Sequence, residues 1–319
     1  MTTTMTILGT GLSGMIGSCI QETLHNTYSF EDLSTESGVD IRNFDQVLDR
    51  VKKSSSAVVL HLAAKTDVDG CEKDRIKDSK ILRSLSKPDL ALRDKDPMDF
   101  DIDWKEWKNE NTAYAVNVVG TLNIVRACKE ANRRLIYIST DFVFDGRENK
   151  TYSEDDKPNP INYYAQTKWW GEQVVRNLLT NYVIVRFAYP YGTHHAVKKD
   201  FVRIIRSRLE SGEEVAGITD QIITPSFAPD IAYALDHLIG HAVSNQTFHL
   251  VGSDSLSPYD IAVAIADQFG YDTQVIKKTT VEEFYKNRAS RPQFLTVSNE
   301  KIRKRGVDMK TFREGLASL

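Results

Sequence analysis

Short apolar runs alternate with longer stretches of helical spacing through the first half of the chain. Apolar runs occupy residues 4–8, 57–62, 135–139 and 183–186, and residues 113–131 place small and apolar side chains on one side of a helix. Such runs, bounded by Gly, Asn or Pro, are typical of buried strands, and their alternation with helices is typical of a parallel sheet. The pattern therefore predicts an α/β fold built on a doubly wound parallel sheet.

The pattern becomes less regular in the second half, which predicts a smaller mixed α/β domain. We therefore divide the chain into a sheet domain, residues 1–186, and a second domain, residues 187–319. The elements expected in the second domain are strands at 214–218 and 247–251 and helices at 229–242 and 258–269.

One stretch of the first domain breaks the rhythm. Residues 73–111 are highly charged, with two prolines and the pair Trp104 and Trp107. We predict an insertion here, a surface excursion near the ligand edge of the sheet. A passive charged loop is one interpretation. A lid or an oligomer contact is the other, because exposed tryptophans usually cover something.

A glycine-rich loop follows the first predicted strand. Residues 9–17 read Gly-Thr-Gly-Leu-Ser-Gly-Met-Ile-Gly and lead into a helix. Glycines there permit a tight turn and bring the backbone close to a pyrophosphate at a helix N-terminus, where free N–H groups favour an anion. Placed between a strand and a helix, the loop predicts a Rossmann dinucleotide-binding domain. The expected cofactor contacts are Gly11, Leu12, Ser13, Gly14, Met15 and Ile16.

The end of the second predicted strand bears on the choice between NAD and NADP. Residues 28–32 read Tyr-Ser-Phe-Glu-Asp, with no Arg or Lys beside them in sequence. A carboxylate there accepts the ribose 2′-hydroxyl of NAD, whereas a basic residue suits NADP, so NAD is slightly favoured. Either carboxylate could be the ribose ligand, with a solvated loop acid as the alternative at each position. Further cofactor contacts, with plain sheet packing as the alternative, are assigned to Asp40, Ile41, Leu62, Ala63 and Ala64.

A tyrosine and a lysine four residues apart are candidates for proton transfer. Tyr164 and Lys168 lie one turn apart on one face of a predicted helix. A phenol ionises near pH ~10, and an adjacent ammonium is expected to lower the pKa of Tyr164 toward the working pH. Thr140, in a Ser-Thr-Asp segment, would offer a hydroxyl to a substrate oxygen. A solvated helix face is the alternative interpretation of the Tyr/Lys pair taken alone.

Composition narrows the classes of function. The 319 residues are 41% hydrophobic and 27% charged with a net charge of −3, so no nucleic-acid or membrane partner is expected. No apolar run approaches a membrane span, and the N-terminus lacks the basic start of a signal peptide. The three scattered cysteines form no metal or redox motif, and no ligand cluster requires a metal. We expect a cytoplasmic protein and leave a homodimer open.

Several segments together carry a resemblance to a known family. They are the glycine loop, Ser-Thr-Asp-Phe-Val-Phe-Asp-Gly at 139–146, Tyr164 with Lys168, Thr-Asp-Gln at 219–221, Thr-Pro-Ser at 224–226 and Arg-Pro at 291–292. In this order they make the chain resemble the extended short-chain dehydrogenase/reductases, and most of all the dTDP-4-dehydrorhamnose reductase group. The resemblance covers the chain apart from residues 73–111.

The resemblance implies a role for each matching residue. Tyr164 would be the general acid for the keto oxygen, Lys168 would hold the nicotinamide ribose and tune the tyrosine, and Thr140 would orient the substrate oxygen. Asn117 would support the lysine, with a purely local hydrogen-bonding role as the alternative. The residues implied to contact the substrate are Asp141, Phe142, Tyr189, Gln221 and Arg291. For Asp141 the alternative is a structural role, in which it holds a neighbouring backbone amide.

The chain also departs from the group's pattern. Residues 186–192 read Arg-Phe-Ala-Tyr-Pro-Tyr-Gly where the group tends to have Arg-Thr-Ser-Trp before a tyrosine and glycine, so the substrate pocket is expected to be reshaped. Phe142 stands where related 4,6-dehydratases have a glutamate, which counts against dehydration. Two His-His and Lys-Lys pairs, at 194–195 and 198–199, either meet a diphosphate or form a polar loop.

The function implied is NAD(P)H-dependent reduction of the keto group of a nucleotide-linked 4-keto-6-deoxy sugar. The cofactor would be NAD or NADP, and the partner a nucleotide-sugar substrate. One alternative is a nucleotide-sugar epimerase, which uses the same tyrosine. Another is a non-catalytic, cofactor-binding regulatory subunit resembling that of methionine adenosyltransferase, although such a protein need not keep Thr140, Tyr164 and Lys168.

Overall fold

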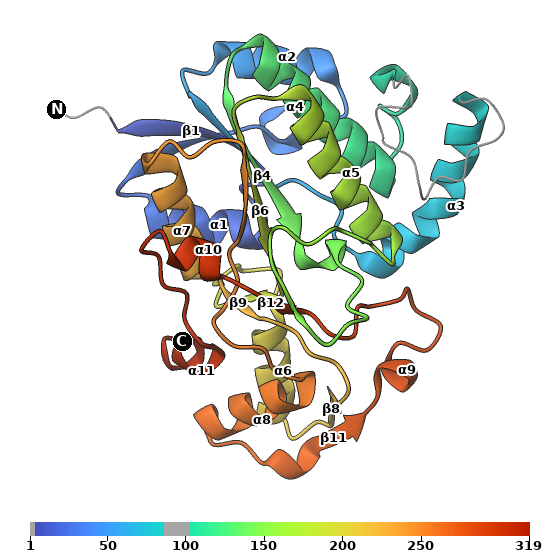
Figure 1. Ribbon diagram of the computed structural model, residues 1–319, viewed down its shortest axis with the longest axis vertical. Helices are drawn as coiled ribbons and strands as arrows, with labels where there is room; N and C mark the ends of the chain where they lie inside the picture. Colours follow the sequence, from blue (N-terminus) through green and yellow to red (C-terminus); the bar gives the residue numbers. More distant parts are fainter. Residues whose placement is uncertain (1–3, 86–102) are drawn as a thin grey trace.

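The structure, a computed structural model, describes residues 4–85 and 103–319. Its centre is a six-stranded sheet in which every pair of neighbouring strands is parallel (Figure 1). The predicted doubly wound parallel sheet is therefore confirmed. In spatial order, the strands are β2 (Tyr28–Asp32), β1 (Met5–Thr10), β3 (Val58–His61), β4 (Arg134–Thr140), β6 (Tyr182–Phe187) and β10 (Gln246–His249).

Helices cover both faces of the sheet (Figure 1). The central strands are apolar along their whole length because both of their faces are buried; every residue of β3 and β4 is buried. Among the described residues, no helix is long and apolar enough to cross a membrane. One face carries α1 (Met15–Leu24) and α7 (Ala228–Gly240), and the other carries α2 (Phe44–Lys53), α4 (Thr121–Glu130) and α5 (Tyr163–Leu178), with α3 (Val68–Leu85) beside α5.

The helix predicted over residues 113–131 is present but not uniform. It contains a π-helical segment, η4 (Ala115–Gly120), directly before α4. Gly120 lets the Ile41 side chain pack closely there: a Cβ at this position would lie 2.7 Å from the Cδ1 atom of Ile41. Single π turns within helices often occur beside functional sites, and this one carries Asn117.

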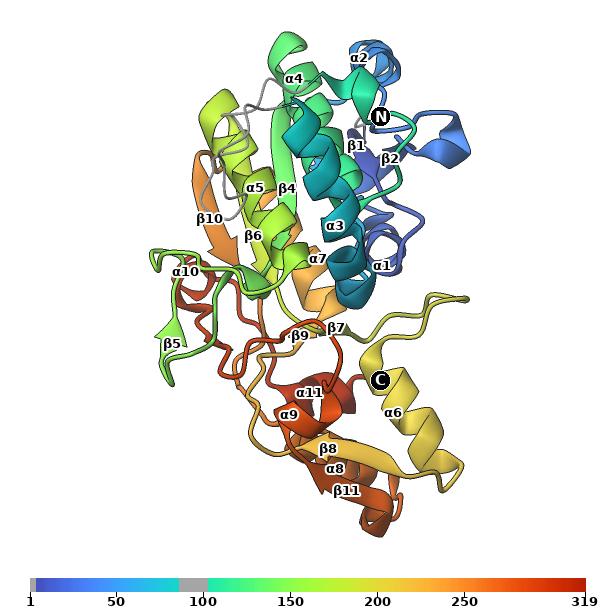
Figure 2. The same cartoon turned by 90° about the vertical axis from the view of Figure 1, so that its right-hand side faces the viewer.

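A smaller unit lies beyond the carboxyl ends of the strands (Figures 1 and 2). It has its own apolar core, in which aromatic residues such as Tyr191 and Phe312 pack against α8. Its elements are β7 (Pro190–Tyr191), α6 (Phe201–Glu210), β8 (Val215–Ile218), β9 (Ser226–Phe227), α8 (Pro258–Phe269), β11 (Ile276–Thr279), α9 (Val281–Phe284) and α11 (Phe312–Ala317), with β5 (Thr151–Tyr152), β12 (Thr296–Val297) and α10 (Glu300–Arg303) at its border with the sheet.

The predicted boundary at residue 186 does not divide the two units cleanly. After that residue the chain returns to the sheet, where β10 pairs with β6 and α7 packs against α1. Parallel strands are joined only by crossover connections. A strand and a helix late in the chain can therefore complete the sheet that contains β1 and the helical layer that contains α1. Two of the four elements predicted in the second domain, the helix at 229–242 and the strand at 247–251, therefore belong to the sheet layer.

The prediction of a surface excursion is wrong for part of residues 73–111. Its beginning is the second half of α3, which packs against α5, and Trp107 is fully buried beside Tyr114 with ring centroids 4.6 Å apart. This helix was not predicted because its many charged residues, which the exposed face of a helix tolerates, obscure the spacing of its apolar positions. The rest of the stretch, residues 86–102, lies outside the described residues.

Candidate functional site

The chain changes direction across the sheet between β1 and β3. From β1 it runs to β2 at the edge, and then returns to β3 on the other side of β1. In sheets of this kind, the crevice at the carboxyl ends beside such a switch point is where ligands bind. A cavity of about 390 Å³ opens there. Its walls include Gly11, Gly14, Met15, Ile16, Gly17, Leu62, Ala63, Ala64, Thr140, Asp141, Phe142, Tyr164, Lys168 and Tyr189.

The glycine loop forms the floor of one end of this cavity. Gly11 has a φ of +65°, and a Cβ there would lie 2.8 Å from the backbone nitrogen of Ala63. Gly14 is the N-cap of α1 and makes no side-chain capping bond, so the first N–H groups of the helix are left to a ligand. These features fit the pyrophosphate of a dinucleotide, which needs close backbone approach and free donors.

Gly17 should be as sensitive as the loop itself. An added Cβ would lie 2.6 Å from the Cα and the carbonyl oxygen of Leu12, which are backbone atoms and cannot rotate away. We expect Gly17→Ala to cost roughly 1–3 kcal/mol of unfolding free energy and to weaken dinucleotide binding, measured by denaturant unfolding and by fluorescence titration. Gly240→Ala is the matched control, because no atom of residues 4–85 or 103–319 lies within 4 Å of its added Cβ. Equal behaviour of the two variants would contradict the close packing.

A buried histidine holds the strand ends around the loop. Thr121 donates its hydroxyl proton to the carbonyl of Asn117, so His61 must donate Nε2–H to Thr121 Oγ1, 3.0 Å away. Its Nδ1 then accepts from Thr10 Oγ1 at 2.7 Å, and that oxygen accepts the backbone N–H of Ala63. Burial lowers the pKa of His61 to about 3, which keeps it in this neutral form. The bonds fix Ala63 against Gly11.

The tyrosine and lysine lie on one face of α5, as predicted, and both line the cavity. Their electrostatics differ from the prediction. Burial raises the pKa of Tyr164 above its ordinary value, and burial lowers the pKa of Lys168 to about 7. The Nζ atom of Lys168 lies 4.2 Å from the centre of the Tyr137 ring. The prediction that the pKa of the tyrosine lies toward the working pH is therefore wrong here, because burial disfavours the charged phenolate.

Thr140 and Asp141 sit beside the phenol. The Thr140 hydroxyl is a hydrogen-bond partner of Tyr164, lies 3.0 Å from Asp141 Oδ1, and accepts the N–H of Phe142. Asp141 is 2% exposed, and its second oxygen, Oδ2, has no partner among the described residues. Burial raises the pKa of Asp141 to about 7. A carboxyl group that gains and loses a proton near neutrality therefore lies two hydrogen bonds from the phenol.

A buried ion pair behind Lys168 was not anticipated from the sequence. Glu172, one turn further along α5, accepts two bonds from Arg186 on β6, at 2.8 and 2.6 Å, and both side chains are almost fully buried. The charge of Glu172 raises the pKa of Lys168, although burial lowers it more. The only sequence signal was a glutamate four residues after the lysine, which is also typical of an ordinary helix face.

The second unit contributes aromatic walls to the cavity. Tyr189 has a φ of +40°, an uncommon backbone conformation for a tyrosine, and it lies directly before β7. Its ring centroid is 5.9 Å from that of Phe142, and its hydroxyl is a hydrogen-bond partner of Tyr285. Unusual backbone conformations cluster at ligand sites, where the surrounding structure holds them in place. The segment that was predicted to reshape the substrate pocket therefore forms part of the cavity wall.

Seven predicted site residues do not line the cavity. Leu12 belongs to the core, and Ile41 packs on Gly120. Four others are engaged elsewhere: Ser13 through its carbonyl with His195, Asp40 with Arg42, Gln221 with the carbonyl of Pro292 and Arg291 with Asp69. Asn117 is buried and bonds Lys65 and Thr167, the residue before Lys168.

Other residues that line the cavity were not predicted from the sequence. Ile138 and Phe187 lie at the ends of β4 and β6, where they look like ordinary strand residues. Thr66 and Val68 lie after β3, and Pro190 follows Tyr189. Position at the carboxyl end of a strand was their only signal. Lys198, which the sequence left open between a diphosphate contact and a polar loop, also lines the cavity.

The end of β2 combines acidic and basic groups. The carboxylate of Asp32 accepts a hydrogen bond from Ser34 Oγ at 2.5 Å. Arg50, from α2, donates to the carbonyl of Asp32 at 3.2 Å and lies 3.6 Å from Glu31 Oε2. No basic residue is near this site in sequence, but the fold brings one there.

Comparison with known proteins gives consistent matches. A family model described as RmlD substrate binding domain matches residues 5–88 and 101–319. A probable low-salt glycan biosynthesis reductase of Haloferax volcanii is 28% identical over 97% of this chain and 95% of its own length. A dTDP-4-dehydrorhamnose reductase of Mycobacterium tuberculosis is 35% identical over 58% of this chain and 61% of its own. The crystal structure of dTDP-4-dehydrorhamnose reductase from Bacillus anthracis in complex with NADP superposes with a TM-score of 0.80 at 27% identity, covering 98% of both chains.

Proposed function

Because the chain belongs to the RmlD substrate binding domain family, we propose that it is an NAD(P)-dependent reductase of the keto group of a nucleotide-linked 4-keto-6-deoxy sugar. The observation that carries the proposal is the meeting of Thr140, Tyr164 and Lys168 with the glycine loop around one cavity. A dinucleotide site alone would suit many activities. A protonated phenol beside it supplies what carbonyl reduction needs.

The cofactor, when bound, supplies the hydride. The N–H groups at the start of α1 would hold its pyrophosphate, with Gly11 and Gly14 allowing close approach. Lys168 would bind the nicotinamide ribose. Asn117 would brace this arrangement, since it joins the loop after β3 to α5 next to the lysine. Leu62, Ala63 and Ala64 would form the wall behind the ring.

Tyr164 would donate its phenolic proton to the keto oxygen as negative charge develops there. Its raised pKa keeps the phenol protonated at neutral pH, which is the state a general acid requires. The O–H bond of the tyrosine breaks, and a new O–H bond forms on the sugar. Thr140 would then pass its own proton to the phenolate and receive one from Asp141, so that the carboxyl group ends ionised. The proton lost from Asp141 is restored from solvent after the product leaves.

The protonation state of Asp141 sets the direction of these bonds. When the carboxyl is ionised, Thr140 donates to it and Tyr164 donates to Thr140, so the phenolic proton points away from the substrate. When the carboxyl is protonated, it donates to Thr140, and Thr140 donates to Tyr164. The phenolic proton is then free for the keto oxygen. Asp141 therefore acts as both a proton source and an orienting group in this proposal.

The sugar would lie against Phe142 and Tyr189, whose rings contact each other on the phenol side of the cavity. Gln221 and Arg291 would support the substrate from a second layer. Gln221 holds the carbonyl of Pro292 at 2.9 Å, and Arg291 pairs with Asp69 at 3.1 Å, so both shape the segment that carries Tyr285 and the residues after it.

We propose that NAD and NADP are both accepted, with NAD slightly favoured because two carboxylates stand at the end of β2. Arg50 would offer the positive charge that a 2′-phosphate needs. We expect Arg50→Met to raise the Kd for NADPH roughly fivefold and to leave the Kd for NADH within about twofold, since only NADPH carries the phosphate. Fluorescence titration with both cofactors measures this. A parallel loss for both would assign Arg50 to the fold instead.

The proposed activity is tested by mixing the purified protein with NADH or NADPH and a panel of nucleotide-linked 4-keto-6-deoxy sugars. Loss of the reduced-nicotinamide absorbance with at least one sugar is the expected result, and mass spectrometry should show a product heavier by two hydrogens. Tight cofactor binding without oxidation by any sugar would overturn the reductase proposal and favour the regulatory alternative. An isomer of the substrate with no net cofactor use would favour the epimerase.

The setting of this activity is also a proposal. A cytoplasmic location fits a substrate and a cofactor that are both charged and water-soluble. Cell fractionation tests it. Light scattering tests whether the protein forms the homodimer left open by the sequence.

A further inference from the structure

A loop of the second unit reaches back to the glycine loop. Residues 193–199, which we name the strap, connect β7 to α6 (Figure 2). His195, near its middle, lies with Nε2 3.0 Å from the carbonyl oxygen of Ser13, 182 residues earlier in the chain. The strap therefore joins the second unit to the loop that begins α1.

The hydrogen bonds of His195 fix its proton. Its Nδ1 accepts the backbone N–H of Lys198 at 2.9 Å and that of Val197 at 3.3 Å. Because Nδ1 is an acceptor, the ring carries its hydrogen on Nε2, which donates to Ser13. One side chain therefore holds both the glycine loop and the backbone of Lys198.

The other side of the strap is anchored to α6. Asp200, 2% exposed, accepts from the N–H and the hydroxyl of Thr193 and also caps α6 by accepting the N–H of Arg203. Arg203 in turn donates to the carbonyl of His195 at 2.8 Å. A loop tied at its start, middle and end holds the side chains it carries near fixed positions.

Lys198 is the charged side chain that this arrangement delivers to the cavity. It lines the cavity, and its backbone N–H is bound by His195, which contacts Ser13 of the glycine loop, so it lies near the end where α1 begins. Within residues 4–85 and 103–319, no ion pair involves Lys198. Asp200, the carboxylate nearest to it in sequence, is occupied by Thr193 and Arg203.

We propose that Lys198 binds the cofactor's pyrophosphate from the side opposite α1, and that His195 is the positioning residue that holds the strap in place for it. The identity of the ligand rests on the proposed function, because the cavity could also receive the diphosphate of a nucleotide sugar. The cofactor is favoured because Lys198 shares its part of the cavity with the glycine loop. Backbone donors on one side and an ammonium on the other would neutralise both phosphates.

Lys198→Met tests the contact, with Lys199→Met as a control that removes the same charge from the next residue. Lys199 is exposed, does not line the cavity, and lies 3.5 Å from Ser207 Oγ. Binding is measured without sugar substrate, by fluorescence titration of NADH and NADPH and by calorimetry with dTDP. We expect the first variant to raise both cofactor Kd values about tenfold, and the control to change them less than about twofold. The dTDP Kd should stay constant.

The outcomes separate the inference from the proposed function. Equal cofactor Kd values in the two lysine variants, or a loss confined to dTDP, would overturn the inference even if the protein reduces keto sugars. The expected tenfold loss would support it even if no sugar is reduced. Reduced nicotinamide riboside, which has no phosphate, should bind wild type and Lys198→Met alike, and a tenfold loss with that probe as well would overturn a phosphate contact.

A second variant tests the positioning role. His195→Ala should raise the cofactor Kd about threefold by releasing the strap, and the double variant with Lys198→Met should bind no more weakly than Lys198→Met alone. Additive losses would overturn the coupling between the two residues. Circular dichroism and thermal unfolding of each variant confirm that the fold is kept, and the strap is exposed enough for both substitutions to be tolerated.

Discussion

Replacing Tyr164 by phenylalanine should lower kcat by about 10²- to 10⁴-fold, the range typical of a lost general acid. The phenyl ring keeps the packing of the tyrosine against Phe142, whose ring centroid lies 6.3 Å away. Only the proton donor is removed. The Kd for NADH or NADPH should therefore stay within about threefold of wild type. Single-turnover measurement of cofactor oxidation, together with fluorescence titration, gives both quantities.

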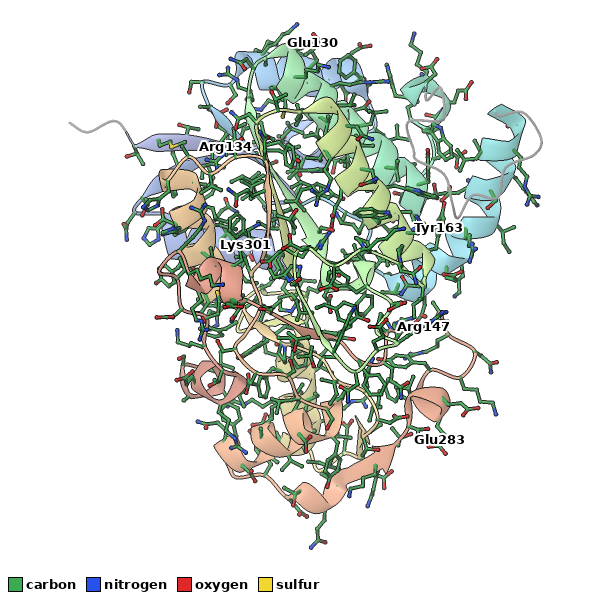
Figure 3. The ribbon with its side chains drawn as sticks, viewed as in Figure 1. Glu130, Arg134, Arg147, Tyr163, Glu283 and Lys301 are labelled. Carbon is green, nitrogen blue, oxygen red and sulfur yellow. The ribbon has the colours of Figure 1, made fainter. Side chains whose placement is uncertain are left out.

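The neighbouring residue offers a matched control. Tyr163 does not line the cavity; it lies on α5 where this helix packs against α3 (Figure 3), and its hydroxyl donates to the buried Asp78 at 3.0 Å. Tyr163→Phe removes the same hydroxyl one position earlier. It should cost about 1–3 kcal/mol of unfolding free energy and leave kcat within about twofold. Comparable loss of turnover in the two variants would mean that the effect comes from the helix and not from the acid.

Asp141→Asn should reduce kcat about a hundredfold near pH 6, because the variant keeps a donor toward Thr140 but has no proton to pass on. The pH dependence is the sharper readout. In wild type, the proposed relay works only while the carboxyl is protonated, so kcat should fall as the pH rises through about 7, the pKa to which burial raises this group. In the variant this fall should be absent. An unchanged pH profile would remove Asp141 from the proton path.

The same carboxyl should leave a mark on stability. Its folded pKa of about 7 is above the value of about 3.9 in an unfolded chain. The folded state therefore binds this proton more tightly, so the stability is fully present below the unfolded pKa and is lost as the pH rises through the folded pKa. Between about pH 5 and pH 8 the loss should be roughly 2–3 kcal/mol. Urea unfolding of wild type and Asp141→Asn at both pH values measures it, and the variant should lack this loss.

Site residues that belong to a local sequence pattern could be predicted. The glycines Gly11 and Gly14 of the loop, Tyr164 with Lys168, and Thr140 at a strand end all line the cavity. Each belongs to a local pattern, a turn that needs glycine or one turn of a helix, and local patterns are written in consecutive residues. Four strands of the sheet, β1, β3, β4 and β6, were likewise predicted from their apolar runs.

Contacts between distant segments could not be predicted from the sequence pattern. Gln221 and Arg291 carried a resemblance, yet each is engaged by other side-chain or backbone groups outside the cavity. Arg50 comes to the end of β2 from a helix whose own pattern shows only an amphipathic surface. Trp107 was expected at the surface because its neighbours are charged, and it is buried. In each case the deciding contact joins segments that are far apart in sequence.

The sequence by itself determined the sheet, the dinucleotide loop and the Tyr/Lys pair, because periodicity and backbone requirements are set within a few residues. Only the tertiary structure decided the protonation chemistry and the outer wall of the cavity. Burial, not the neighbouring charge, sets the pKa values of Tyr164 and Lys168, and burial is a property of the whole fold. The placement of Lys198 against the glycine loop likewise depends on a hydrogen bond from His195 to Ser13, which chain order alone does not reveal.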